Sequence, residues 1–253
     1  YTLSLHDALP ICLRFAILIF SAVVFFASVG VLLYYWHQDR SDKSVRDQVA
    51  ELFGKQIEGG DEGIPPEFQA LYAENPDTAG WLRIDGTNVD SVVMHAPDTL
   101  EKYLHTDFNG QYSARGMLYV AEKCDLQTSD NIIIYGHHMN DGTMFGQLEQ
   151  YQDAAYGASH STIIFNTIYG YRTYELVAAI RTRVLADWES GFKYYEYTGS
   201  DETQFWEYVN FIQSNKLYDT GVELQPGDKI LTLSTCAYHE TDGRFIIVAK
   251  QVG

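Results

Sequence analysis

The spacing of the hydrophobic positions changes along the chain, and its first part is a single unbroken apolar run. Residues 15–36, FAILIFSAVVFFASVGVLLYYW, contain no charge and are long enough to cross a hydrocarbon core of about 30 Å as a helix. Tyr34, Tyr35 and Trp36 close the run with the aromatic side chains that are typical of a membrane interface. The pattern predicts a transmembrane helix over residues 15–36, inside an anchor segment of residues 13–36.

The sequence does not determine whether this anchor is cleaved or in which direction it crosses the membrane. A cleaved signal peptide is the alternative, although its apolar region would be shorter and a small-residue cleavage site would follow it. The flanking charges do not fix the orientation, because three basic residues, Arg40, Lys43 and Arg46, follow the run and only Arg14 precedes it. Residues 1–12 do not resemble a natural start, and we interpret them as a non-native or cytoplasmic leader.

Residues 37–75 predict a helical stalk and a second, short helix. Four apolar residues fall on one face of a predicted helix over residues 41–57: Val45, Val49, Leu52 and Phe53. The Gly, Pro and acidic residues of the stretch 59–67 are typical of a connection. The short helix follows this connection and is expected to end before Pro76.

Beyond residue 76 the pattern changes to short apolar runs that are bounded by Gly, Asn and Asp. Eight such runs predict strands: residues 80–84, 89–94, 116–121, 131–136, 161–166, 171–185, 228–236 and 244–251. Regular short strands with turn signals favour a barrel or a sandwich over alternating strand and helix units. One helical pattern, residues 201–214, interrupts the series. We therefore predict a mainly β domain over residues 76–253.

Charge and cysteine content narrow the class of function. The net charge of -17 and the sequence pI near 4.7 argue against a nucleic-acid partner, since that affinity depends largely on Lys and Arg. The three cysteines, Cys12, Cys124 and Cys236, are too few and too scattered for a disulfide framework or a paired-cysteine metal site. Each cysteine is therefore considered singly.

Cys236 ends the apolar run KILTLSTC, where a strand leads into a loop and can present a side chain. Position alone favours a packed core thiol, because free Cys is among the most buried residue types, and Cys124 keeps that interpretation. A thiol with a pKa of about 8.5 is mostly protonated at neutral pH, so a catalytic Cys236 needs a partner for its proton.

His137 is the candidate partner. It follows the run NIIIYG as Cys236 follows its own run, and Gly136 before it is expected to let the backbone turn sharply. His239 is the main alternative, because it is close to Cys236 in sequence. A metal site at His137 and His138 is disfavoured, since adjacent residues of an extended chain point to opposite sides. The other histidines are interpreted as surface or structural residues: His6, His37, His95, His105 and His160.

Arg244 opens the last predicted strand, GRFIIVAK, eight residues after Cys236. That separation suits a hairpin that returns the chain beside the thiol. In acyl transfer a preorganised donor at the carbonyl oxygen can contribute on the order of 3 kcal/mol to transition-state stabilisation. The alternative is a solvated arginine at the start of a strand.

Three segments together resemble the sortases, the cell-wall cysteine transpeptidases of Gram-positive bacteria: YGHHMNDGTMFG, TLSTC and GRFIIVAK. They are most similar to class B sortases, and the similarity covers roughly residues 64–253. The resemblance implies an eight-stranded sortase β-barrel with N-terminal helices and a helix, residues 201–214, between the sixth and seventh strands. The uncharged anchor also fits this family.

The resemblance further implies roles for five residues. Cys236 corresponds to the nucleophile, His137 to the acid and base, and Arg244 to the group that holds the substrate carbonyl oxygen. Ser234 and Tyr135, two residues before Cys236 and His137 respectively, match positions that line the substrate groove. No metal and no organic cofactor is implied.

The implied reaction is cleavage of a C-terminal sorting signal, of the NPxTx or a related type, after its Thr, with a thioester on Cys236. A peptidoglycan precursor or stem-peptide amine then resolves the thioester and joins the surface protein to the wall. The expected partners are thus sorting-signal-bearing surface proteins, that amine, and the membrane through residues 15–36. The expected location is the cell membrane, with a single span and the catalytic domain outside the cell.

Three alternatives remain at this stage. A cysteine peptidase would use the same Cys and His pair with water in place of the amine. A pilin-polymerising sortase would differ in the amine that enters the groove. A non-catalytic, membrane-tethered binding domain would keep Cys236 buried and inert.

Overall fold

The computed structural model describes residues 11–57, 59–199, 201–237 and 241–253. The chain divides into two compact units, Tyr1–Ser44 and Val45–Gly253. All eight strands lie in the second unit.

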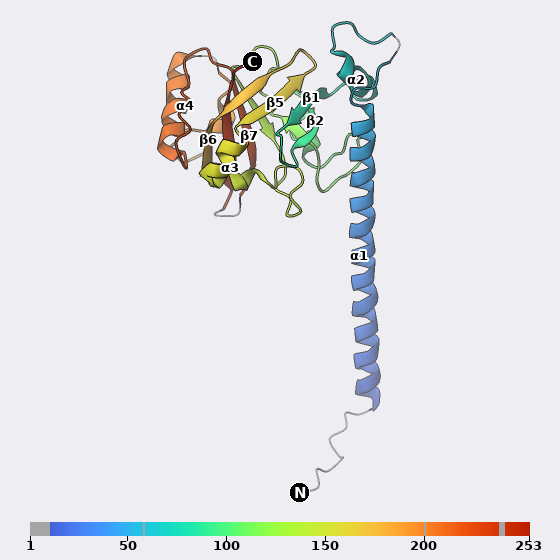
Figure 1. Cartoon of the computed structure of the whole chain (residues 1–253). Helices are drawn as coiled ribbons and strands as arrows, with labels where there is room; N and C mark the ends of the chain where they lie inside the picture. Colours follow the sequence, from blue (N-terminus) through green and yellow to red (C-terminus); the bar gives the residue numbers. More distant parts are fainter. Residues whose placement is uncertain (1–10, 58, 200, 238–240) are drawn as a thin grey trace. The chain divides into compact units, whose positions relative to one another are not determined.

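Helix α1 (Ile11–Leu52), blue in Figure 1, replaces the two helices predicted for residues 15–36 and 41–57. The intervening residues contain neither Pro nor Gly, so nothing in the sequence stops the first helix. The helix ends before Gly54, whose φ of +79° leaves the helical region, rather than at Ile57. Within the described residues, the helix over Leu13–Leu52 is the one that is long and apolar enough to cross a membrane.

Two short helices, η2 (Pro66–Phe68) and α2 (Gln69–Glu74), occupy the region where the sequence predicts one short helix. Phe68 and Leu71 are fully buried in an apolar cluster that includes the last two turns of α1. The cluster also contains residues of β2 (Asp90–Met94), so burial of these side chains attaches the helices to the barrel.

The eight strands close into a barrel in the order β1, β2, β3, β4, β7, β8, β6, β5. Their bounds are β1 (Thr78–Arg83), β2 (Asp90–Met94), β3 (Leu118–Val120), β4 (Asn131–Tyr135), β5 (Thr162–Thr167), β6 (Thr173–Arg183), β7 (Ile230–Cys236) and β8 (Gly243–Gln251). Every strand overlaps one of the predicted runs. The eight-stranded barrel is therefore confirmed, and closure of the sheet excludes the sandwich.

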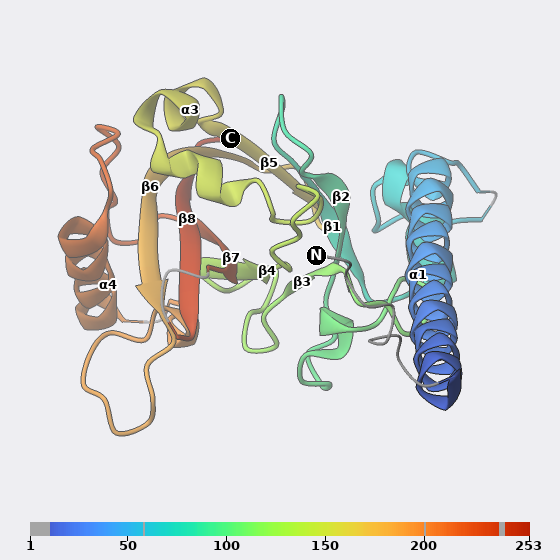
Figure 2. The same ribbon diagram turned by 90° about the horizontal axis from the view of Figure 1, so that it is seen from below.

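Three neighbouring strands, β4, β7 and β8, carry the segments of the predicted site. β4 runs parallel to β7, with Tyr135 opposite Ser234. β8 returns antiparallel to β7, with Cys236 opposite Arg244, so the predicted hairpin is confirmed. Figure 2 shows β6, β8, β7 and β4 in neighbouring positions.

Successive side chains of β7 point in turn to the interior of the barrel and to its outer face. Leu233 belongs to the main apolar core inside the barrel. Ser234 points the other way, and its hydroxyl shares a hydrogen bond of 2.9 Å with the hydroxyl of Tyr194. Because side chains alternate along a strand, Cys236 lies on the same outer face as Ser234.

Helix α4 (Glu202–Asn215) covers part of this outer face beside β6 (Figure 1). Asp201 caps it, since its carboxylate accepts the backbone N–H of Gln204 at 2.9 Å. Phe205 and Ile212 are buried in an apolar cluster with residues of β6 and β8. The helix predicted for residues 201–214 is confirmed.

Within the described residues, four short helical elements were not predicted from the sequence: η3 (Lys102–Leu104), η4 (Leu148–Gln152), α3 (Ala154–Ser159) and η5 (Tyr194–Glu196). Each has at most two turns, which is too short for a hydrophobic period to show. Two of them, η3 and η5, border the predicted site.

Candidate active site

The ends of β4, β7 and β8 bring three predicted residues into one row. The parallel register pairs Tyr135 with Ser234, and His137 and Cys236 each follow two residues after this pair. Cys236 is in turn the direct partner of Arg244. Neighbouring strands lie about 4.8 Å apart, so the backbones that carry the imidazole, the thiol and the guanidinium are adjacent.

The three side chains line one pocket of about 440 Å³ on the outer face of the barrel. Ser234 and Tyr135 line it as well, so all five residues predicted for the site lie together. Cys236 is partly exposed there, which does not fit the alternative of a buried, inert thiol. The volume is in the range of pockets that bind small ligands.

His137 is held by a backbone carbonyl. Its Nε2 lies 2.8 Å from the oxygen of Leu104, and a carbonyl can only accept, so Nε2 carries the hydrogen and the neutral ring keeps its lone pair on Nδ1. Burial lowers the pKa of His137, the Leu104 contact opposes this, and His105, whose ring lies 5.2 Å away, lowers it further. Neutral imidazole is therefore favoured at neutral pH, with Nδ1 as the nitrogen that can exchange a proton.

Gly136 is required by packing. The φ of Gly136 lies outside the left-handed region, so the backbone conformation does not require glycine. However, a Cβ at this position would lie 2.5 Å from Leu118 Cδ2 and 2.7 Å from Phe145 Cδ2. The end of β4 therefore presses directly on these two side chains, which fixes the position of His137 next to it.

Arg244 is anchored at the mouth of the β7–β8 hairpin. Its Nη1 donates to the carbonyls of Gly243 and Asp242, at 3.0 and 3.3 Å. The Gly243 carbonyl also accepts the N–H of Ala237 at 2.9 Å, which closes the hairpin. His239, the alternative partner for Cys236, lies outside the described residues.

The two residues predicted to bind substrate lie at different depths. Ser234 is 1% exposed and shares its hydroxyl with Tyr194. Burial raises the pKa of Tyr194 to about 12 although the Ser234 contact opposes it, so this phenol stays protonated. Tyr135 is half-buried, and its ring lies 5.6 Å from that of Tyr119. Aromatic side chains thus form much of the pocket wall.

Comparison with known proteins decides the family. The family model described as Sortase domain matches residues 82–252, which is well over half of the chain. The chain belongs to the sortase family. The resemblance seen in the sequence is thereby confirmed, and the sortase is an enzyme of the cysteine transpeptidase class.

The relatives of this sortase include class B members. Sortase B of Staphylococcus aureus is 28% identical over 221 residues, which are 84% of this chain and 86% of the relative. The solved structure of Clostridium perfringens sortase B is 30% identical, with a TM-score of 0.65 over 72% of this chain and 98% of that one. The S. aureus sortase B–substrate complex is 26% identical, with a TM-score of 0.72 over 85% and 98%. The chain is a class B sortase.

The second described thiol of this sortase, Cys124, is a core residue. Its Sγ lies 3.5 Å from the carbonyl of Asn131 and accepts the N–H of Ile133 at 3.4 Å. Burial raises the pKa of Cys124 to about 11, so it stays a thiol at neutral pH. The interpretation of Cys124 as a packed thiol agrees with this position.

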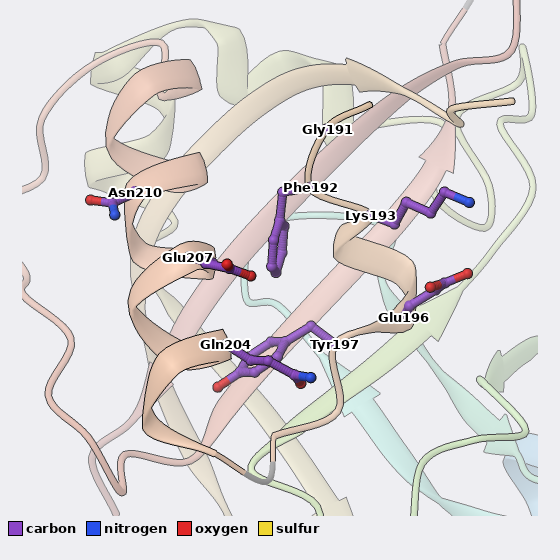
Figure 3. Close-up of a pocket in the computed structure, with 8 residues that line it drawn as sticks. All are labelled: Gly191, Phe192, Lys193, Glu196, Tyr197, Gln204, Glu207 and Asn210. Carbon is purple, nitrogen blue, oxygen red and sulfur yellow. The ribbon is translucent and has the colours of Figure 1, made fainter. Parts of the chain in front are cut away.

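A larger cleft of about 550 Å³ lies between α4 and the segment around η5, away from the catalytic row. Figure 3 shows Phe192 and Tyr197 from this segment, and Gln204 and Glu207 from α4, gathered at it. None of the five predicted site residues lines this cleft. Within the part of the chain that the structure describes, no group of three or more His, Cys, Asp or Glu side chains is arranged to hold a metal ion.

Three features of the site were missed by reasoning from the sequence. Leu104 contributes a backbone carbonyl, which no residue type can reveal. His105 was interpreted as a surface or structural residue, but its ring lies 5.2 Å from that of His137, and Tyr194, whose hydroxyl shares a hydrogen bond with that of Ser234, was not singled out. Only the concentration of tyrosines between β6 and α4, at residues 194, 195 and 197, gave a signal that could have pointed to the pocket.

Proposed function

We propose that this sortase cleaves a C-terminal sorting signal, of the NPxTx or a related type, after its Thr and transfers the acyl part to an amine of peptidoglycan. The observation that supports this most strongly is the row of His137, Cys236 and Arg244 in one pocket of a sortase barrel. The roles below rest on that row. Ser234 and Tyr135, which line the same pocket, are proposed to contact the signal.

The first half-reaction acylates Cys236. His137 takes the thiol proton at Nδ1, and the thiolate attacks the carbonyl carbon of the signal's Thr. The C–N bond then breaks, and the imidazolium gives its proton to the nitrogen of the leaving peptide. The product is a thioester between Thr and Sγ of Cys236, with no net oxidation or reduction.

Arg244 stabilises the oxyanion that forms during this attack. Its backbone is the ladder partner of Cys236, and its Nη1 is held by the carbonyls of the hairpin, so the group is positioned before the substrate arrives. A donor placed in this way contributes on the order of 3 kcal/mol to transition-state stabilisation.

The second half-reaction releases the enzyme. The acceptor amine attacks the thioester carbonyl, His137 takes a proton from the attacking nitrogen, and Sγ of Cys236 leaves as a thiolate that receives this proton back from the imidazolium. Neutral imidazole is the form that can accept this proton, which fits the lowered pKa of His137. The surface protein is then joined to the stem peptide through a new amide bond.

The membrane is the proposed setting of this chemistry. Sortases are cell-surface enzymes, and the first part of α1 is long and apolar enough to act as an anchor. We assign residues 13–36 to a single span, residues 37–75 to the stalk and N-terminal helices, and residues 76–253 to a catalytic domain outside the cell.

Partition between an amine and water tests the proposed transfer. The full chain in detergent is incubated with an NPxTx peptide and increasing concentrations of a stem-peptide amine mimic, and both products are quantified by mass. The ligated product is expected to rise at the expense of the hydrolysis product. Hydrolysis alone at saturating amine would reject transpeptidation in favour of a cysteine peptidase, and no cleavage of any related signal would reject the substrate class.

A further inference from the structure

We infer that Arg115 is a positioning residue for the reaction: its ion pair with Asp141 ties the hairpin that carries His137 to the segment that holds the acceptor of His137. This inference rests on the proposed function of His137. Neither residue lines the catalytic pocket, so the effect has to pass through the backbone.

The hairpin begins directly after β4 and contains both His137 and Asp141. The N–H of Phe145 donates to the carbonyl of His137 at 3.0 Å, and His138 pairs with Met144 as an isolated bridge. A movement of the hairpin tip is therefore transmitted to the backbone of His137 through these pairs.

Asp141 and Thr143 form a turn at the tip of this hairpin. The carboxylate of Asp141 accepts the N–H and the hydroxyl of Thr143, at 3.0 and 2.7 Å. Nη1 of Arg115 donates to the other carboxylate oxygen and, at 2.7 Å, to the Thr143 hydroxyl. Burial alone would raise the pKa of Asp141, but the contacts with Thr143 and Arg115 outweigh it and hold the pKa at about 2.

Arg115 is largely shielded from water, which strengthens this ion pair relative to a pair between two exposed side chains. The side chain of Arg115 is 14% exposed and that of Asp141 is 45% exposed. Charges that are shielded from water interact more strongly, and a planar guanidinium can hold two oxygens at once. The pair is thus a firm connection between residues 26 apart in sequence.

The segment around Arg115 lies along η3. Its backbone donates twice to that region, from Ser113 to the carbonyl of His105 at 3.0 Å and from Met117 to the carbonyl of Tyr103 at 2.9 Å. Arg115 therefore extends from a backbone segment that is already fixed at both ends.

Gly116 brings this segment into direct contact with the acceptor of His137. It has a φ of +56°, and a Cβ there would lie 2.3 Å from the oxygen of Leu104. That oxygen accepts the Nε2 hydrogen of His137. The ion pair of Arg115 thus connects the hairpin that carries the His137 imidazole to the segment that packs on the Leu104 carbonyl, and these two groups form the hydrogen bond described above.

Loss of the Arg115–Asp141 ion pair is expected to change kcat more than KM. A catalytic group displaced by about 1 Å can cost up to about 100-fold in rate, whereas the walls that bind the peptide stay in place. For Arg115→Gln and for Asp141→Asn we expect kcat to fall about 10- to 100-fold with KM within about twofold of the wild type. Arg115→Lys is expected to recover part of kcat, because it keeps the charge but not the planar pair of donors.

The test uses the full chain in detergent and a matched control pair. Arg83 and Asp85 form an ion pair of 2.9 Å with both side chains exposed, at 50% and 76%, so Arg83→Gln and Asp85→Asn remove equal charges elsewhere. Steady-state kinetics with the sorting peptide are measured for every variant. The ¹⁵N shifts of the His137 ring report whether Nε2 still carries the hydrogen, and thermal unfolding monitors the fold.

The outcomes separate the inference from the proposed function. A selective fall in kcat, with a mixture of His137 tautomers and unchanged control variants, supports the inference. Wild-type kcat, KM and ring shifts in both Asp141→Asn and Arg115→Gln would overturn it. If Arg115→Gln does not fold, Asp141→Asn, which alters the exposed partner, decides alone. A wild-type chain that cleaves no signal, by contrast, would refute the proposed function itself.

Discussion

His137 shows how one backbone carbonyl can assign a role to each nitrogen of an imidazole. The carbonyl of Leu104 accepts a hydrogen bond from Nε2–H, which leaves the lone pair of the neutral ring on Nδ1. Burial then keeps the ring neutral, and the nearby ring of His105 acts in the same direction. The sequence predicted that His137 is the proton acceptor, but it could not show which ring nitrogen accepts the proton. That choice is made by the backbone carbonyl of Leu104 in η3.

Alkylation is expected to distinguish the two described thiols. Cys236 is partly exposed in the pocket, whereas Cys124 is 3% exposed and burial raises its pKa to about 11. Brief treatment of the folded chain with iodoacetamide, followed by peptide mapping, should label Cys236 and leave Cys124 unmodified. In the unfolded chain both should react. Equal labelling of the two thiols in the folded chain would show that Cys236 has no special access.

Replacement of Arg244 by Lys is expected to lower kcat/KM about 100-fold or more, because one ammonium cannot reproduce the fork of donors that holds an oxyanion. The fold should be retained, since Arg244 lies at the start of β8 and is only partly buried. Kinetics and thermal unfolding of Arg244→Lys are compared with those of Arg181→Lys, which alters another arginine of the neighbouring strand β6 outside the pocket. Turnover of Arg244→Lys close to wild type would remove Arg244 from the mechanism.

At the scale of elements, the strands were predictable and the short helices were not. The apolar residues of runs such as NIIIY and GRFIIVAK predict buried strands, and β4 and β8 form at these positions. α1 runs through the predicted gap after Trp36, since a polar stretch without Pro or Gly does not stop a helix. η3 has three residues and no period, so the acceptor for His137 was invisible before the fold was known.

Addition of one methyl group before His137 tests the packing of β4. In Gly136→Ala the new Cβ would overlap Leu118 and Phe145, and overpacking of this kind costs about 1–3 kcal/mol. We expect a lower unfolding midpoint and a loss of activity as the end of β4 shifts. Gly30→Ala is the control, because nothing lies within 4 Å of a Cβ at that position. If Gly136→Ala behaves like the control, the close packing does not determine the position of His137.

The ion pair of the His137 hairpin gives stability a defined dependence on pH. The pKa of Asp141 is lowered from 3.8 to about 2, so its contribution is fully present above pH 3.8 and is lost as the pH falls toward 2. Thermal unfolding of the wild type and of Asp141→Asn should therefore differ near neutral pH and converge as the pH falls through this window. A difference that stays constant down to pH 2 would show that the charge of Asp141 is not involved.

At the scale of the whole molecule, the closed barrel brings segments that are far apart in the sequence together in one site. His137 and Cys236 are 99 residues apart, and only the parallel pairing of β4 with β7 makes them neighbours. The sequence contained both strands but not their register, because parallel pairing leaves no local turn signal. By contrast, the hairpin that brings Arg244 beside Cys236 was predictable from a short separation along the chain.

Capture of the acyl-enzyme tests the central claim most directly. The full chain in detergent is mixed with a sorting peptide without an acceptor amine, quenched in acid within the first turnover, and analysed by intact-protein and peptide mass spectrometry. We predict a mass increase equal to the peptide up to its Thr, located on Cys236, sensitive to hydroxylamine, and missing in Cys236→Ala but present in Cys124→Ala. Cleavage of the peptide by Cys236→Ala at the wild-type rate, or an adduct on any other residue, would contradict the account.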